Sequence, residues 1–229
     1  MRLRKVPHVP DVPRVPGLFC NPRERLYAVV DVEACERTQR RPLDVADAFF
    51  SAGTLLLQLR AKTLPSGALL DLALTIVEKA HRAGARVLVN DRADLAVVSH
   101  AAGVHVGQDD LAPASVRRVT GPALLVGLST HTAQQVAESV RQPISYLAMG
   151  PVFATATKAT GYDAVGYGAV REAAAAADSH GLSVVAIGGI TLETAARVIA
   201  AGARSVAVIG DLLVGNPEAR AREYLSALA

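Results

Sequence analysis

The chain has 229 residues, of which 51% are hydrophobic and 20% charged, a balance typical of a globular protein rather than a disordered or fibrous one. Aromatic residues make up only 4% and tryptophan is absent, so the core must consist mainly of Ala, Val, Leu and Ile. The formal net charge is only +3, and the four Phe and five Tyr are scattered along the chain. This composition argues against nucleic-acid binding.

The sequence carries no sign of a secreted or membrane protein. Cys20 and Cys35 do not form a CxxC pair, so neither a disulfide framework nor a cysteine zinc site is expected. The basic first residues are followed by regularly spaced prolines instead of the apolar run of a signal peptide. No stretch reaches the roughly 18 apolar residues of a membrane helix. We therefore expect a cytoplasmic protein with no membrane or nucleic-acid partner.

The first part of the chain is rich in proline. Residues 1–22 hold five of the 12 prolines, and four of them recur every third residue: Pro7, Pro10, Pro13 and Pro16. This period is typical of an extended polyproline II segment. Two interpretations stay open, a dispensable extension and a peptide ligand for an aromatic-lined groove. We predict an extended N-terminal arm over residues 1–22 and a single domain over residues 23–229.

From residue 25 onward, short aliphatic or β-branched runs alternate with longer, alanine-rich amphipathic segments, a pattern typical of βα units around a parallel sheet. The predicted strands are Leu26–Asp31, Thr54–Leu59, Arg86–Val89, Gly103–Val106, Leu124–Leu128, Tyr146–Ala148, Ser183–Ile187 and Ser205–Ile209. The predicted helices are 44–52, 66–83, 92–100, 113–119, 132–141, 168–179, 192–201 and 217–227. Eight of each predict an α/β fold, a single (β/α)₈ TIM barrel. A doubly wound open sheet is the alternative, but no GxGxxG follows the first strand.

In such a barrel the functional site is formed at the carboxyl ends of the strands. Gln58, Arg60 and Lys62 stand at every second position around the end of the second strand, so they share the face opposite Leu55, Leu57 and Leu59 and are expected to point into the barrel mouth. Two cations that converge there indicate an anionic partner, because burying an unpaired cation is costly. The alternative is an internal ion pair with a neighbouring carboxylate.

Acidic residues follow the next two strands. Asn90 and Asp91 end the third strand, and Asp110 follows the fourth. Two carboxylates at adjacent strand ends can share one Mg²⁺ ion, whose other positions go to water and phosphate. A helix N-cap is the alternative role for Asp110. His105, which lies within the fourth strand, is interpreted as a core or wall histidine rather than a ligand.

The remaining strand ends carry uncharged groups and one more cation: Ser129, Thr155, Thr157 and Lys158. A nucleophile pair of Ser129 with His131 is not favoured, because no orienting carboxylate follows in a recognisable elbow. Glycines after the seventh and eighth strands let backbone N–H groups approach a phosphate, as is usual for this fold. The sequence therefore predicts a cationic diphosphate site beside a neutral monophosphate site.

Six segments at the strand ends together resemble the thiamine-phosphate synthase family: Gln58–Lys62, Asn90–Arg92, His105–Asp110, Gly127–His131, Gly150–Lys158 and Ala186–Ile190. The resemblance covers about residues 25–227. It implies a (β/α)₈ transferase that couples 4-amino-2-methyl-5-pyrimidinylmethyl diphosphate to a thiazole phosphate and releases diphosphate and thiamine phosphate.

The resemblance also implies roles for individual residues. The pyrimidine diphosphate would be held by Gln58, Arg60, Lys62, Asn90, Ser129 and Lys158, of which Arg60, Lys62, Ser129 and Lys158 would be catalytic. Mg²⁺ would lie on Asp91 and Asp110. The thiazole phosphate would be held by Thr155, Thr157, Gly189, Ile209 and Gly210. Both substrates are small phosphorylated molecules, and the oligomeric state is not readable from the sequence.

Three positions depart from the family pattern. Most relatives have an acidic residue where Ala61 stands and a proline at Ala154, but neither side chain is needed for the diphosphate site. Gly210 replaces the usual serine, which removes a hydroxyl group and keeps the backbone N–H, so weaker thiazole binding is expected. Two other functions stay open: a thiazole tautomerase, which relies on a histidine and lacks much of the diphosphate site, and a non-catalytic phospho-ligand sensor.

Overall fold

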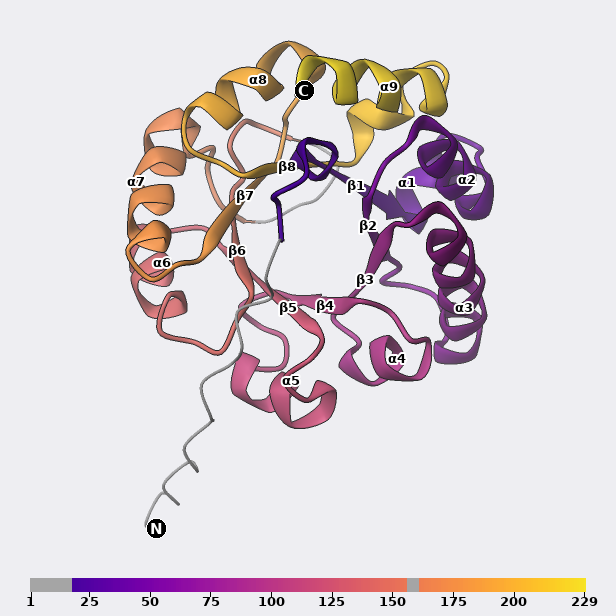
Figure 1. Ribbon diagram of the computed structural model, residues 1–229, viewed down its shortest axis with the longest axis horizontal. Helices are drawn as coiled ribbons and strands as arrows, with labels where there is room; N and C mark the ends of the chain where they lie inside the picture. Colours follow the sequence, from indigo (N-terminus) through magenta and orange to yellow (C-terminus); the bar gives the residue numbers. More distant parts are fainter. Residues whose placement is uncertain (1–17, 156–160) are drawn as a thin grey trace.

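The computed structural model describes residues 18–155 and 161–229. Its parallel strands pair in chain order and close into a barrel, because β1 pairs with both β2 and β8. Figure 1 shows the ring of strands with the helices outside it. The strands are β1 (Leu26–Asp31), β2 (Leu56–Arg60), β3 (Arg86–Asn90), β4 (Gly103–Val106), β5 (Leu125–Thr130), β6 (Tyr146–Met149), β7 (Ser183–Ile187) and β8 (Ser205–Val208). The predicted TIM barrel is confirmed.

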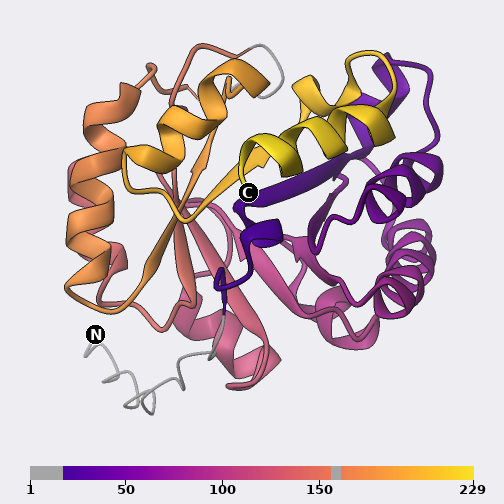
Figure 2. The ribbon, with the colours of Figure 1, turned by 45° about the horizontal axis from the view of Figure 1, so that its top comes forward.

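The α-helices are α1 (Val32–Arg37), α2 (Pro42–Ala52), α3 (Ser66–Ala83), α4 (Ala93–Val98), α5 (Pro113–Thr120), α6 (Ala133–Ser139), α7 (Gly166–Asp178), α8 (Leu192–Ala200) and α9 (Pro217–Ala227). Two short 3₁₀ helices are η1 (Pro22–Arg25) and η2 (Gly210–Leu213). The sequence pattern does not predict α1, η1 or η2, because six or four residues are too few to show a helical period. The last helix, α9, packs beside α2 and closes the outer ring (Figures 1 and 2).

The strands alternate between two apolar layers. In β1, Leu26, Ala28 and Val30 belong to the layer between sheet and helices, whereas Tyr27 and Val29 belong to the layer inside the barrel. Aliphatic side chains make up most of the outer layer, which accounts for the low aromatic content, whereas the inner layer also holds Phe19, Tyr27 and Tyr146. The helices contribute at helical spacing; the buried residues of α3 are Leu69, Ala73, Ile76, Val77 and Ala80.

Residues 18–22, which the sequence analysis placed in the extended arm, lie against the barrel. Phe19 is 9% exposed and belongs to the inner apolar layer. Its ring meets the ring of Tyr146 edge-on, with the centroids 5.7 Å apart. The apolar Leu18 and Phe19 thus make this stretch part of the fold. The four regularly spaced prolines lie outside the described residues.

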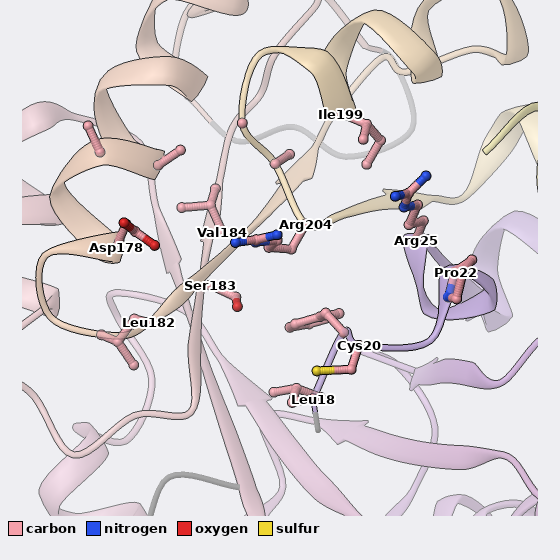
Figure 3. A pocket seen from close by; sticks show the side chains of 15 residues that line it. Leu18, Cys20, Pro22, Arg25, Asp178, Leu182, Ser183, Val184, Ile199 and Arg204 are labelled. Carbon is pink, nitrogen blue, oxygen red and sulfur yellow. The ribbon is translucent and has the colours of Figure 1, made fainter. Parts of the chain in front are cut away.

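A cavity of about 740 Å³ lies at the amino ends of β7 and β8 (Figure 3). Its wall includes Leu18, Cys20, Ser183 and Arg204, and none of the predicted site residues. The predicted site lies at the opposite, carboxyl ends of the strands, as usual for this fold. Across residues 18–155 and 161–229, no helix has the length and apolar character to cross a membrane.

Candidate functional site

The carboxyl ends of β5 to β8 surround a cavity of about 350 Å³. Its lining includes Ser129, which was predicted for the pyrimidine diphosphate, and four residues predicted for the thiazole phosphate: Thr155, Gly189, Ile209 and Gly210. Residues from the two predicted subsites therefore meet in one cavity. The described walls carry one charged carboxylate, that of Asp211, and no Lys or Arg side chain.

The cationic residues lie on the other side of the mouth, at the end of β2 and in the loop that follows it. The Arg60 guanidinium is ion-paired with Asp31 and lies 3.6 Å from the Glu33 carboxylate. The Lys62 ammonium is ion-paired with Asp91. The internal ion pairs, which the sequence analysis held as the alternative, are therefore present. Because both cations have carboxylate partners, their presence alone does not require an anionic ligand.

Glu33 holds the segment that carries Lys62. Its Oε1 accepts hydrogen bonds from Lys62 N at 2.7 Å, from Thr63 N at 3.0 Å and from the Thr63 hydroxyl at 3.0 Å. Burial opposes ionisation of this carboxyl group, but the hydrogen bonds outweigh burial and lower its pKa. Glu33 thus stays ionised and fixes the loop after β2.

Asp91 and Asp110 face each other at the ends of β3 and β4. Burial raises the pKa of Asp91; the hydrogen bond from Lys62 lowers it, and the neighbouring Asp110 carboxyl group raises it again. Asp91 has a φ of 62°, in the left-handed region that Asp and Asn tolerate best among side-chain-bearing residues. Asp110 Oδ2 also accepts a hydrogen bond from Gly107 N at 2.8 Å, so it stabilises its own turn as well.

This pair fits a hard divalent cation. The Asp110 carboxyl group raises the pKa of Asp91, so a positive charge between the two groups would be favourable, and Mg²⁺ is commonly held by one or two carboxylates plus waters and substrate phosphates. No group of three or more His, Cys, Asp or Glu side chains suited to a metal occurs within the described ranges. The donor set therefore suits a cation that leaves most of its positions to substrate and water.

Ser129 is held from two sides. Its hydroxyl group is 2.9 Å from His105 Nε2, and its carbonyl oxygen accepts a hydrogen bond from Gln108 Nε2. His131 has other partners: its Nδ1 meets the carbonyl oxygen of Gly150, and its ring stacks on Tyr162 with centroids 4.1 Å apart. The structure therefore gives no support to a Ser129–His131 nucleophile pair, and His105 is the buried wall histidine that the sequence predicts.

The glycine-rich half is formed by the loops after β7 and β8. Gly188 and Gly189 have φ values of 99° and 63°, and a Cβ at Gly189 would lie 2.6 Å from the Ala154 carbonyl oxygen. These positions therefore require glycine. Within the described residues, the backbone N–H of Gly189 donates no hydrogen bond, so it is available to an anion.

Asp211 joins the loops of the glycine-rich half. Its Oδ2 accepts hydrogen bonds from Leu192 N at 3.2 Å, from Arg220 Nη2 at 2.9 Å and from the Tyr224 hydroxyl at 2.6 Å. Burial raises the pKa of Tyr224, and the Asp211 carboxylate raises it further. Asp211 thus accepts the hydrogen bond of the first backbone N–H of α8, and the Arg220 guanidinium balances the Asp211 carboxylate beside the cavity.

The other predicted residues are placed as follows. Gln58 is buried with its amide inside the barrel, and Asn90 is half-buried at the end of β3. Thr157 and Lys158 lie outside the described residues. Asp31 and Glu33 were missed, although Asp31 ends the first predicted strand and the rule applied to the other strand ends would have found it. Tyr27 and Tyr146 give no local sequence signal.

The chain is similar in sequence to known proteins over most of its length. A family model described as "Thiamine monophosphate synthase" matches residues 26–212. A thiamine-phosphate synthase of Koribacter versatilis is 42% identical over 206 residues, which cover 89% of this chain and 95% of the relative. A thiamine-phosphate synthase of Roseiflexus castenholzii is 36% identical over 214 residues, covering 93% and 92%.

Among solved structures, a thiamine phosphate pyrophosphorylase from Pyrococcus furiosus is similar with a TM-score of 0.80 at 24% identity, covering 90% of this chain and 96% of the other. At that identity the likeness concerns the barrel fold alone. The family model, by contrast, spans nearly the whole barrel, from β1 to η2, and the sequence relatives match over most of both chains. This chain belongs to the thiamine monophosphate synthase family of transferases.

Proposed function

We propose that this protein is a thiamine-phosphate synthase of thiamine biosynthesis. It couples 4-amino-2-methyl-5-pyrimidinylmethyl diphosphate to 4-methyl-5-(2-phosphoethyl)thiazole, and also to the carboxylated form of this thiazole. The observation that carries the proposal is the division of one barrel mouth into two halves. The ends of β2 to β4 hold cations and facing carboxylates, which suit a diphosphate with its metal, and the glycine-rich cavity suits a phosphate monoester.

The reaction needs charge stabilisation more than a protein nucleophile. The bond between the pyrimidine methylene carbon and the diphosphate oxygen breaks, and its electron pair leaves with diphosphate. The resulting pyrimidine cation is resonance-stabilised, and the thiazole nitrogen captures it with its lone pair. Arg60, Lys62 and Ser129 stabilise the negative charge that develops on the leaving group, and the family resemblance assigns Lys158 the same role.

Asp91 and Asp110 would hold Mg²⁺, or Mn²⁺ in its place. When bound, the cation supplies charge stabilisation to the leaving diphosphate. A cation bound to Asp91 would also weaken the ion pair between Asp91 and the Lys62 ammonium, so that Lys62 could donate to a diphosphate oxygen.

The proposal predicts that purified protein, given both substrates and Mg²⁺, produces thiamine phosphate and diphosphate, both measurable by chromatography. EDTA should abolish the reaction and excess Mg²⁺ should restore it. An isomerised thiazole without coupled product would identify a tautomerase instead. Binding of both phosphorylated compounds without any conversion would identify a sensor.

The glycine-rich half gives a second prediction. Gly189→Ala should raise the KM for the thiazole phosphate by roughly tenfold or more, because the new Cβ displaces the loop whose amide meets the phosphate. Gly215→Ala is the matched control: Gly215 also has a positive φ, of 64°, but nothing lies within 4 Å of a Cβ there. Steady-state kinetics on both variants test this. An equal change of KM in both variants would contradict a specific role of Gly189 in binding the phosphate.

A further inference from the structure

A continuous chain of hydrogen bonds crosses the inside of the barrel. Gln58 Nε2 donates to Tyr27 Oη at 3.0 Å, and Tyr27 Oη lies 3.1 Å from Tyr146 Oη. Tyr146 Oη lies 2.9 Å from His105 Nδ1, and His105 Nε2 lies 2.9 Å from Ser129 Oγ. All five residues are buried. The chain thus connects two residues that the family resemblance assigns to the pyrimidine diphosphate, Gln58 and Ser129.

One glycine makes this chain possible. Gly127 in β5 is the register partner of His105 in β4 and of Tyr146 in β6, so the Tyr146–His105 hydrogen bond passes directly over it. A Cβ at Gly127 would lie 2.3 Å from Tyr146 Oη and 2.4 Å from His105 Nδ1. Side chains of two strands that are not neighbours therefore meet only because the strand between them has no side chain at this point.

The protons along this chain of hydrogen bonds can be arranged in two self-consistent directions. Each tyrosine hydroxyl group has one proton to donate, and a neutral imidazole has one N–H. In the first direction Gln58 donates, Tyr27 donates to Tyr146, Tyr146 donates to His105 Nδ1, and His105 Nε2–H donates to Ser129. The Ser129 proton is then free to point outward. In the reverse direction Ser129 donates inward, and Gln58 accepts from Tyr27 through its carbonyl oxygen.

Resting on the proposed function, we propose that the pyrimidine substrate selects the first direction and that Tyr27, Tyr146 and His105 are positioning residues for Ser129. The 4-amino group of the pyrimidine is a donor, so a Gln58 side chain that binds this group must present its carbonyl oxygen to it. The Gln58 NH₂ group then faces Tyr27, which fixes every following hydrogen bond. The Ser129 hydroxyl group consequently points at the leaving diphosphate as a donor. Recognition of the base and stabilisation of the leaving group are thus coupled.

The direct test is the tautomer of His105 in wild-type protein. Protein labelled with ¹⁵N-histidine is studied by NMR with the pyrimidine diphosphate and Mg²⁺, without the thiazole, and the His105 signals are assigned by their loss in His105→Gln. We expect a neutral ring protonated at Nε2. A ring protonated at Nδ1, or at both nitrogens, would overturn the proposal. This measurement needs no variant of the chain itself to be active.

Two variants test the coupling. Gly127→Ala and Tyr146→Phe should each lose the uniform Nε2–H tautomer and lower kcat roughly 10- to 100-fold, the range of a lost hydrogen bond to a charged group. The KM for the thiazole phosphate should stay within about threefold. Gly168→Ala and Tyr167→Phe are the matched controls, since a Cβ at Gly168 meets nothing within 4 Å and the contacts given for Tyr167 in the described residues are made by its ring, to Phe153 and Arg197.

The outcomes separate this proposal from the proposed function. If the wild-type protein forms no thiamine phosphate, the proposed function fails, whatever the His105 tautomer. If it forms thiamine phosphate and Tyr146→Phe keeps both kcat and the tautomer, the positioning role fails and the function stands. A kcat loss in the folded variants together with a changed tautomer supports the positioning role, because a purely structural defect would leave the tautomer in the remaining folded protein unchanged.

Discussion

Asp110→Asn should lower kcat for thiamine phosphate formation by roughly 10²–10³, with a higher Mg²⁺ concentration needed for half-maximal rate. Asparagine keeps an oxygen that accepts the hydrogen bond from Gly107 N, so the turn is preserved while the charge opposite Asp91 is lost. Asp91→Asn should behave in the same way, since Asn also tolerates the left-handed φ of 62°. Initial rates over a Mg²⁺ titration measure both effects.

The neighbouring carboxylate supplies the control. Asp109 is exposed, and the described part of the chain gives its side chain no hydrogen bond. Asp109→Asn should therefore stay within about twofold of wild type in both kcat and Mg²⁺ dependence. The metal assignment fails if Asp110→Asn keeps wild-type kcat, or if all three variants lose activity to the same extent.

Arg60→Ala should reduce both stability and activity, whereas Lys62→Ala should reduce activity alone. The Arg60 side chain is 14% exposed and its partner Asp31 2%, so removing Arg60 leaves a buried, uncompensated carboxylate. Breaking such a pair typically costs about 3–5 kcal/mol of unfolding free energy. The Lys62 side chain is 44% exposed, and an exposed pair contributes about 0–1 kcal/mol.

Urea unfolding of the two variants measures the difference in unfolding free energy, and steady-state kinetics on the folded protein measure the loss of activity expected in both. We expect kcat to fall by roughly 10²–10³ in each, because each removes a cation from the leaving diphosphate. Arg60→Lys separates the role in stability from the role in activity: it keeps a positive charge beside Asp31 but loses the planar guanidinium group, which can bind two oxygens at once. Equal loss of stability in Arg60→Ala and Lys62→Ala would contradict the different burial of the two ion pairs.

The architecture was readable from the sequence because it depends on local patterns. Aliphatic runs of strand length alternate with amphipathic helices such as Ser66–Ala83, and this alternation leads to a parallel barrel whatever the details of packing. Segments without enough residues to show a period were not readable. The short helices η2 and α1 are of this kind. The packing of Phe19 was not readable for a different reason, because it depends on Tyr146, which lies far along the chain.

The sequence also located the ends of the strands, and with them most of the site. Chain order alone places Arg60, Asp91, Asp110 and Gly189 at one end of a barrel, since every parallel strand ends on the same side. It did not decide their partners. Arg60 meets Asp31 because β1 and β2 are register neighbours, a fact that requires the closed sheet.

Contacts across the barrel interior were decided by the tertiary structure alone. Tyr27, His105 and Tyr146 come from β1, β4 and β6, and no sequence spacing relates them. They meet because the barrel closes and because Gly127 leaves room in the strand between His105 and Tyr146. The sequence by itself determined the barrel and the residue types at its mouth, because these follow from local periodicity. The ion pairs and the hydrogen-bond chain depend on which strands face one another, and only the folded barrel fixes that.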